Sequence, residues 1–335
     1  MKDENDARMQ PGRRAFTALA LAAAAGVAAS GKAAAEGSAS NYPSKPIRLI
    51  APFAPGGTVD IVSRMVGAAL SRRLNQPVVV ENRGGAGTII GTEAAVRAAP
   101  DGYTLYVGVS TLTTNPGLYG HLPYDAEKDL APISLIARMP VVPFANPAFP
   151  AKDVGQLIQY AKAHPDEVNF GSPGYGTMSG MTAELLKKRT GTRMTHIQYK
   201  GGAQSMSDTL AGHIAMTWGT VAQGVEQHKA GQLRALGVSS QRRHPLLPDV
   251  ATFQEQGIDI VTTDWYGLFA PAGIPAGIRD MLNASIKAIL AEPHFGDPAP
   301  AFEFVSSTPD ELGALVKSET DRWTPLIRTL GIKPE

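Results

Sequence analysis

The chain has 335 residues, of which 43% are hydrophobic and 18% are charged, with a net charge of +1 and no cysteine. This length suffices for one large or two medium globular domains. The near-zero charge argues against binding to nucleic acid or to an anionic membrane surface, and the lack of cysteine excludes disulfides, thiol catalysis and thiolate metal sites.

The first 35 residues are typical of a signal peptide. Arg13 and Arg14 precede an apolar run from Ala15 to Ala29, and small residues at 33–35 offer a cleavage site. The run is shorter than the roughly 20 residues that a membrane-spanning helix needs. We therefore expect a periplasmic protein from which residues 1–35 are removed. The paired arginines leave both the general secretory and the twin-arginine export routes open.

Beyond the signal peptide, strand and helix patterns alternate. Apolar runs predict strands over 47–52, 77–81 and 103–109, and apolar residues at helical spacing predict helices that end near Leu74 and Ala98. Strands separated by single helices imply right-handed crossovers. The fold class is therefore α/β, with mainly parallel sheets flanked by helices.

The second half of the chain continues this alternation. The patterns predict helices over 153–162, from Pro275 onward and from Thr308 onward, and strands before Gly201 and over 232–239. Two segments, Pro140–Pro150 and Asp264–Gly267, look like crossings between lobes without a long rigid element. They divide the chain into a first lobe of residues 42–142 plus 266–335 and a second lobe of residues 143–265.

Two glycine turns between a strand and a helix stand out. The first, at 53–58, follows the apolar run that starts at Ile47, and the second, at 172–177, follows Val168–Gly171. Such a turn places free backbone N–H groups at the positive end of a helix, where an anion can approach closely. An ordinary turn is the alternative for each taken singly, but two of them facing across a cleft would form a clamp. Asp60, in the first helical turn, suits either a ligand contact or stabilisation of the helix dipole.

Nucleotide and hydrolase signatures are absent. The glycine patterns at 85–91 and 174–180 have one residue too many for a dinucleotide fingerprint, and no phosphate loop occurs. There is no Gly-x-Ser-x-Gly elbow, and the seven histidines are scattered without ligand spacing. We expect no catalytic residue, no metal and no cofactor.

Several motifs together resemble the Bug receptors, the extracytoplasmic solute-binding proteins of tripartite tricarboxylate transporters. They are Tyr42-Pro-Ser-Lys-Pro-Ile-Arg-Leu-Ile50, Pro52-Phe-Ala-Pro-Gly-Gly57 with Asp60, Val79-Val-Glu-Asn-Arg83, Pro100-Asp-Gly-Tyr-Thr104, Phe170-Gly-Ser-Pro-Gly174, Tyr199-Lys-Gly201 and Gly267-Leu-Phe-Ala-Pro-Ala-Gly273. The resemblance covers essentially the whole chain after the signal peptide. It implies a two-lobed periplasmic-binding fold that closes on small carboxylates, which are held largely by backbone N–H groups and waters.

The resemblance also implies a set of ligand-binding residues. These are Phe53, Ala54, Pro55, Gly56, Gly57, Thr58 and Asp60 in the first lobe with Ser110 and Thr111, and Ser172, Gly174, Tyr175, Gly176, Thr177, Gly201 and Gly202 in the second. Two departures from the family pattern affect the ligand more than the fold. Gly180 stands where the family usually has histidine, and Ala215 stands where it usually has an acidic residue.

These patterns predict a monomeric receptor that captures a small organic carboxylate and delivers it to membrane permease subunits encoded elsewhere. An exported α/β enzyme acting on a small acid and a solute sensor are the alternatives. Neither loop contains an arginine, so an anion there is expected to be held by main-chain donors, hydroxyls and helix dipoles.

Overall fold

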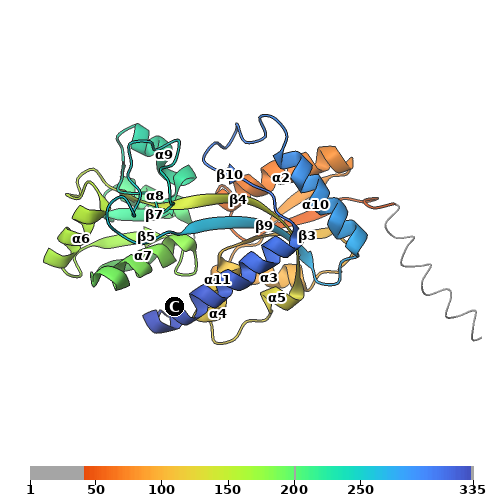
Figure 1. Cartoon of the computed structure of the whole chain (residues 1–335), viewed down its shortest axis with the longest axis horizontal. Helices are drawn as coiled ribbons and strands as arrows, with labels where there is room; N and C mark the ends of the chain where they lie inside the picture. The colour runs from red at the N-terminus through yellow and green to blue at the C-terminus, as the bar shows by residue number, and fades with distance from the viewer. Residues whose placement is uncertain (1–40, 200, 333–335) are drawn as a thin grey trace, which may run out of the picture. The chain divides into compact units, whose positions relative to one another are not determined.

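Strand–turn–helix units recur along the chain in the computed structural model, which describes residues 41–199 and 201–332 (Figure 1). The predicted signal peptide lies outside the described residues. The chain divides into two units, Met1–Ser44 and Lys45–Glu335, and the described helices and strands all lie in Lys45–Glu335. Within the described residues no helix combines the length and apolar character needed to cross a membrane.

The N-terminal half of this unit follows the predicted pattern closely. Its three strands are parallel, because each is joined to the next by a helix that returns the chain to the same end of the sheet. The elements are β1 (Ile47–Ala51), α2 (Thr58–Leu74), β2 (Val78–Asn82), the 3-10 turn η1 (Ala86–Thr88), α3 (Ile89–Val96), β3 (Thr104–Val109) and α4 (Thr111–Leu118).

A second set of alternating elements follows. Strands β5, β6 and β7 are again parallel to one another. The elements are α6 (Val154–Ala163), β5 (Asn169–Ser172), α7 (Met178–Thr190), β6 (Thr195–Gln198), α8 (Gly202–Leu210), β7 (Met216–Thr220), α9 (Val221–Lys229) and β8 (Arg234–Ala235). The segment 232–239, predicted as a strand, is mostly irregular, and only two of its residues form β8. Beyond β8, isolated backbone hydrogen bonds, such as that from Leu236 N–H to the Pro143 carbonyl, hold the segment against β4.

Two antiparallel strands join the halves. The strands β4 (Leu130–Ala145), which follows the short α5 (Ala126–Asp129), and β9 (Thr263–Pro271) pair with a register that includes Met139 with Asp264. Both predicted crossings therefore lie in or run into long strands, so the prediction that they lack a rigid element is wrong. Proline in a sequence argues against a strand because it has no N–H to donate to the neighbouring strand. The strand β4 nevertheless contains both Pro140 and Pro143.

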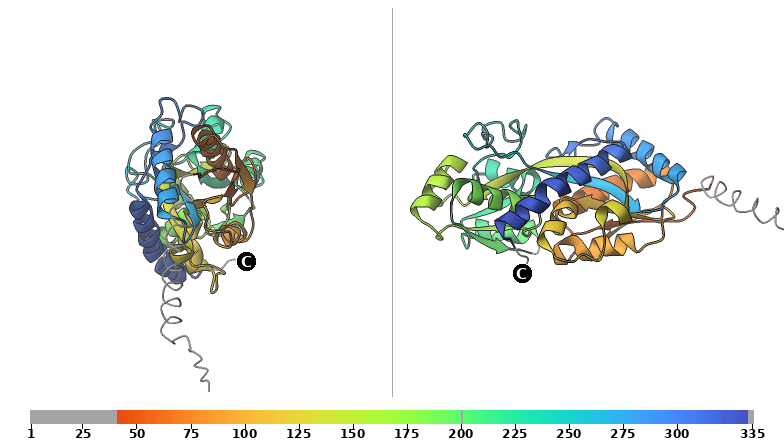
Figure 2. Two further views of the ribbon diagram at one scale, coloured as in Figure 1. Left: turned by 90° about the vertical axis from the view of Figure 1, so that its right-hand side faces the viewer. Right: turned by 60° about the horizontal axis from the view of Figure 1, so that its bottom comes forward.

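The strand order is β2-β1-β3-β9-β4-β7-β5-β6, a single mixed sheet with parallel pairs at its ends and antiparallel pairs at its centre. In Figure 1 α2 and α10 (Ala276–Leu290) lie on one side of one half of the sheet, with α4 and α11 (Pro309–Leu330) on the other. Helices α8 and α9 lie opposite α6 and α7 in the other half (Figure 1), and the right-hand view of Figure 2 shows α11, in dark blue, extending from one half toward the other. The short β10 (Glu303–Phe304) pairs with β4.

Helix α11 contributes to two separate hydrophobic clusters. Leu312 and Val316 pack in the cluster around Tyr106 and Phe269, whereas Trp323 and Ile327 pack in the cluster that holds Trp218. The helix begins with the capping box predicted at Thr308, whose hydroxyl accepts from the Glu311 N–H. Trp218 and Trp265 are both buried in the core, as expected.

Candidate functional site

The first glycine turn connects β1 to α2 and leaves the start of α2 uncapped. Gly57 is the N-cap residue, with φ of −86°, and no side chain bonds to the free N–H groups of the first turn. The left-handed residue is Gly56, at φ of 84°, which is a conformation that glycine adopts without strain. The turn therefore presents main-chain donors together with the positive end of a 17-residue helix.

Asp60 holds this turn in place. Its carboxylate accepts from the Gly56 N–H at 3.0 Å and from the Asn82 amide at 2.9 Å, and it pairs with Arg64 at 2.9 Å. Partial burial opposes ionisation, but the hydrogen bonds from Arg64, Gly56 and Asn82 outweigh it and lower the pKa of Asp60. All these partners belong to the protein, so the structure uses Asp60 to order the loop.

The second glycine turn, between β5 and α7, is organised by a buried hydrogen-bonded chain. Ser172 Oγ lies 2.7 Å from His196 Nε2, and His196 Nδ1 lies 3.2 Å from Glu184 Oε1. Ser172 Oγ also accepts from the Gly174 N–H at 3.1 Å. Thr177 caps α7 and donates to the Gly174 carbonyl at 2.7 Å.

The order serine, histidine, carboxylate is that of a hydrolase triad. A nucleophile must reach its substrate, however. Ser172 is fully buried and lines neither of the two cavities beside the glycine turns. The chain of hydrogen bonds therefore fixes the loop, and we assign no reaction to it.

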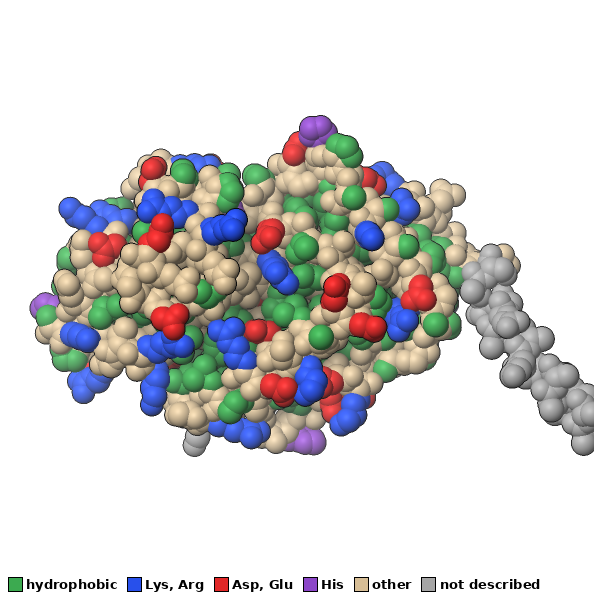
Figure 3. Space-filling view, viewed as in Figure 1, with side chains coloured by type: hydrophobic (Ala, Val, Ile, Leu, Met, Phe, Trp, Pro, Cys, Tyr) green, Lys and Arg blue, Asp and Glu red, His purple; other side chains and the backbone are tan. Residues whose placement is uncertain are grey.

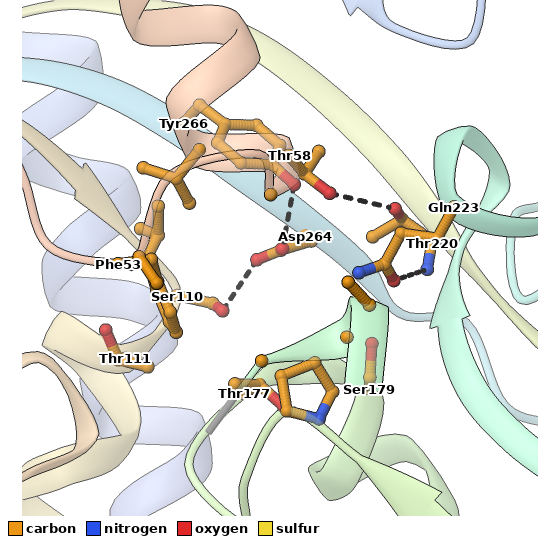
Figure 4. Close-up of a pocket in the computed structure, with 18 of the residues that line it drawn as sticks. Phe53, Thr58, Ser110, Thr111, Thr177, Ser179, Thr220, Gln223, Asp264 and Tyr266 are labelled. Atoms are coloured by element: carbon orange, nitrogen blue, oxygen red, sulfur yellow. Dashed lines mark hydrogen bonds between the residues drawn. The ribbon is translucent and has the colours of Figure 1, made fainter. Parts of the chain in front are cut away.

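The N-termini of five helices converge on one cavity of about 270 Å³. It is lined by residues from the first turns of α2, α4, α7, α8 and α9, which come from both halves of the sheet (Figure 4). The starts of α2, α4 and α8 have no side-chain cap, so their N–H groups remain available. Five positive helix ends around one space favour an anion there.

Side chains from opposite halves meet across this cavity. Thr58 Oγ1 at the start of α2 lies 3.4 Å from Thr220 Oγ1 at the start of α9. A second contact between the halves lies outside this cavity, where Thr114 in α4 donates to the Gly176 carbonyl at 2.6 Å. Gln223 accepts from the Thr220 N–H at 2.9 Å, which holds its amide beside the cavity.

A carboxyl group lies among these positive helix ends. Asp264, in β9, accepts from Ser110 Oγ at 2.6 Å and from the Tyr266 hydroxyl at 3.0 Å (Figure 4). Burial raises the pKa of Asp264, and the hydrogen bonds from Ser110 and Tyr266 only partly offset that effect. Tyr266 is also buried, which together with the neighbouring Asp264 raises its pKa well above the ordinary value.

A second cavity of about 630 Å³ adjoins the first. The two share Phe53, Ala54, Pro55, Thr111, Pro173 and Thr177 as lining residues. The larger cavity extends along η1, α4 and the second glycine turn, and Asn115 Oδ1 in its wall has no hydrogen-bond partner among the described residues. The two glycine turns therefore lie at the junction of the cavities.

Most of the predicted ligand-binding residues line this space. The first cavity is lined by Phe53, Ala54, Pro55, Gly57, Thr58, Ser110, Thr111, Thr177, Gly201 and Gly202, and the second adds Gly174, Tyr175 and Gly176. Gly56, Asp60 and Ser172 line neither cavity, and the first two are engaged with each other.

Sequence reasoning missed several residues that line the first cavity, among them Thr220, Gln223, Asp264 and Tyr266. The first two belong to the capping box that starts α9, a signal that is readable as Thr-x-x-Gln. Asp264 is a charged residue at the edge of an apolar strand pattern, and only the structure shows that it lines the cavity.

Residues 62–332 match the family described as tripartite tricarboxylate transporter family receptor. Protein BugT of Bordetella pertussis is 35% identical over 305 residues, which is 90% of this chain and 94% of BugT. The resemblance to Bug receptors seen in the sequence is thus confirmed.

Solved structures are similar over most of the chain. The periplasmic binding protein BugD has a TM-score of 0.82 at 32% identity, covering 87% of this chain and 100% of BugD. An R. palustris protein solved with adipate has a TM-score of 0.83 at 30% identity, covering 88% and 100%. MatC from Rhodopseudomonas palustris, with bound malate, has a TM-score of 0.80 at 29% identity, covering 85% and 100%.

These structures confirm the two-lobed periplasmic-binding fold. Because the family match spans most of the sequence and BugT is similar over nearly its whole length, the chain belongs to the receptors of the tripartite tricarboxylate transporter family.

Proposed function

We propose that this protein is a periplasmic receptor that binds a small organic carboxylate in the two adjoining cavities and delivers it to a tripartite tricarboxylate-type permease. The observation that carries the proposal is the convergence of five helix N-termini on one cavity. Among the described residues that line the two cavities there is no lysine, arginine or histidine. Main-chain N–H groups, hydroxyls and helix dipoles are thus the anion-binding groups.

The relatives support a carboxylate as the ligand class, since one was solved with adipate and another with malate. The family and its structural neighbours are solute-binding proteins rather than enzymes. Export through the predicted signal peptide and a monomeric state complete the proposal. Acidic and basic side chains are intermixed over the face in Figure 3, which matches the argument against nucleic acid.

Ligand binding is tested by the melting temperature of purified protein across a panel of mono- and dicarboxylates. A ligand at about one hundred times its Kd stabilises the folded state by roughly 2.7 kcal/mol. Mass spectrometry of the acid that co-purifies identifies the natural ligand. A receptor returns its ligand unchanged, so conversion of a bound acid during incubation would instead establish the enzyme, and a panel without any stabilising acid would refute the carboxylate.

A further inference from the structure

The inference concerns Asp264 and rests on the proposed function, because it specifies which carboxylates the cavity accepts. Asp264 is the one charged side chain among the described residues that line the smaller cavity. A carboxylate in a space that favours an anion repels that anion, and the repulsion is stronger at a half-buried site than in bulk water. The cavity therefore contains a feature that carboxylate binding alone does not explain.

The surroundings of Asp264 stabilise its ionised form only in part. It forms no ion pair with a described lysine, arginine or histidine, and its side-chain partners among the described residues are two neutral hydroxyls, those of Ser110 and Tyr266. The raised pKa shows that these groups and the nearby backbone donors do not compensate for burial. A further donor that reaches the carboxylate from the cavity would stabilise its charge.

The two hydroxyls also fix the position of the carboxylate. Ser110 is the residue before α4 and Tyr266 lies two residues along β9, so one partner comes from the end of β3 and the other from the same strand as Asp264. All three residues line the cavity. An acceptor held in this way from two elements selects ligands by geometry as well as by charge.

We propose that Asp264 is a specificity-determining residue that selects carboxylic acids bearing a hydrogen-bond donor, a hydroxyl or an ammonium group, on the carbon chain. The helix N-termini hold the carboxylate of such an acid, and Asp264 accepts from the donor. A plain acid of the same length offers Asp264 no further donor and leaves the charge repulsion uncompensated. A site that hydrogen-bonds a donor on the ligand discriminates strongly against the analogue that lacks this donor.

The test uses matched triplets of acids that differ only at carbon 2: propionate, lactate and alanine; succinate, malate and aspartate; glutarate, 2-hydroxyglutarate and glutamate; adipate, 2-hydroxyadipate and 2-aminoadipate. Calorimetry gives the Kd of each for the wild-type chain. We expect at least one donor-bearing acid to bind about tenfold or more tightly than its plain counterpart, the range for a hydrogen bond to a charged group.

The variant Asp264→Asn removes the charge and keeps the shape. It is expected to weaken the donor-bearing acid by about 10- to 100-fold and to leave the plain acid unchanged or tighter. Asp249→Asn is the matched control, because Asp249 is exposed and lines neither cavity. Circular dichroism checks that each variant folds. If Asp264→Asn does not fold, Asp264→Ala is the second variant, and it should likewise lose the preference for donor-bearing acids over plain ones.

The outcomes separate the two proposals. If plain acids bind as well as their hydroxy and amino counterparts, or if the preference survives in both Asp264 variants, the role of Asp264 is wrong while the carboxylate receptor stands. If no acid of any triplet binds the wild-type chain, the proposed function fails and this inference falls with it.

Discussion

At the residue scale, a side chain at position 57 should affect ligand binding without disturbing the backbone of the turn. Its φ of −86° is ordinary, and a Cβ built on it meets only the Ala54 carbonyl oxygen at 3.8 Å. Gly57→Val should therefore fold normally. The valine side chain would block the approach of an anion to the N–H groups of α2. Loss of two hydrogen bonds to a charged ligand lowers affinity by about 100-fold.

Calorimetry with the acid that co-purifies measures this loss. Gly120→Val is the matched control, since Gly120 has nothing within 4 Å and lies away from the cavities. Unchanged affinity in Gly57→Val would mean that the turn has no ligand contact at this position.

Also at the residue scale, His196 should make stability depend on pH. Burial lowers the pKa of His196, although Glu184 opposes this effect. The unfolded state then binds protons more readily than the folded one, so stability is present above the unfolded pKa of about 6.5 and is lost as pH falls below it. Urea unfolding from pH 8 to pH 5 should show this decline, and it should be shallower in His196→Gln.

The exposed His121 provides the control for that experiment, and His121→Gln should retain the wild-type slope. His244, whose pKa burial also lowers, contributes to the decline in every variant, so the difference between variants is the decisive quantity. Equal slopes in wild type and His196→Gln would contradict the role assigned to His196.

At the element scale, Gly180, one of the two departures from the family pattern, lies where the start of α7 meets the second glycine turn. A Cβ at Gly180, in the first turn of α7, would lie under 3.0 Å from the Gly174 carbonyl oxygen, which is backbone. That carbonyl also accepts from Thr177. The start of α7 therefore packs directly on the second glycine turn, and no side chain fits between them.

Gly180→Ala should displace this turn and weaken ligand binding, despite the preference of helices for alanine. Gly313→Ala in α11 is the matched control, because its Cβ finds only an ordinary contact at 3.6 Å with Pro132. That control should keep full affinity and gain about 0.5–1 kcal/mol in stability. Thermal unfolding measures the stability of both variants, and calorimetry measures their affinity for the ligand. Full affinity in Gly180→Ala would show that displacement of the turn does not affect binding.

At the scale of the whole Lys45–Glu335 unit, binding is expected to bring both glycine turns onto the ligand at once. Thr114 in α4 donates to the Gly176 carbonyl in the second glycine turn, so the halves already touch. Thr114→Val removes this bond and should weaken binding about fivefold, the value of one neutral hydrogen bond. Thr113→Val is the control, because Thr113 bonds only to Ser110 at the start of its own helix.

Closure itself is measured by small-angle scattering, which should give a smaller radius of gyration with ligand than without. Because β4 and β9 are paired strands and α11 packs into both clusters, closure must bend these elements rather than swing on loose linkers. Tight binding without compaction, together with full affinity after replacing Ser172 and Thr177 by alanine, would favour a pocket on one half alone.

The sequence by itself predicted the elements whose signals are local: the strand, glycine turn and helix at 47–74, the second turn at 172–177, and the capped helix after Thr308. These depend on apolar spacing and caps within a few residues, so they can be read without knowing the partners. The family resemblance supplied a set of residues of which most line the cavities, because its motifs include those turns.

Only the tertiary structure showed that the predicted crossings are strands and that Asp264 lies among five helix N-termini. Ser110 and Asp264 are 154 residues apart in the chain, and Thr58 and Thr220 are 162 apart. No local pattern encodes such pairs, because they arise from the order in which strands join the sheet. The position of Asp264 beside the cavity follows from packing, and the selectivity proposed for the site rests on that position.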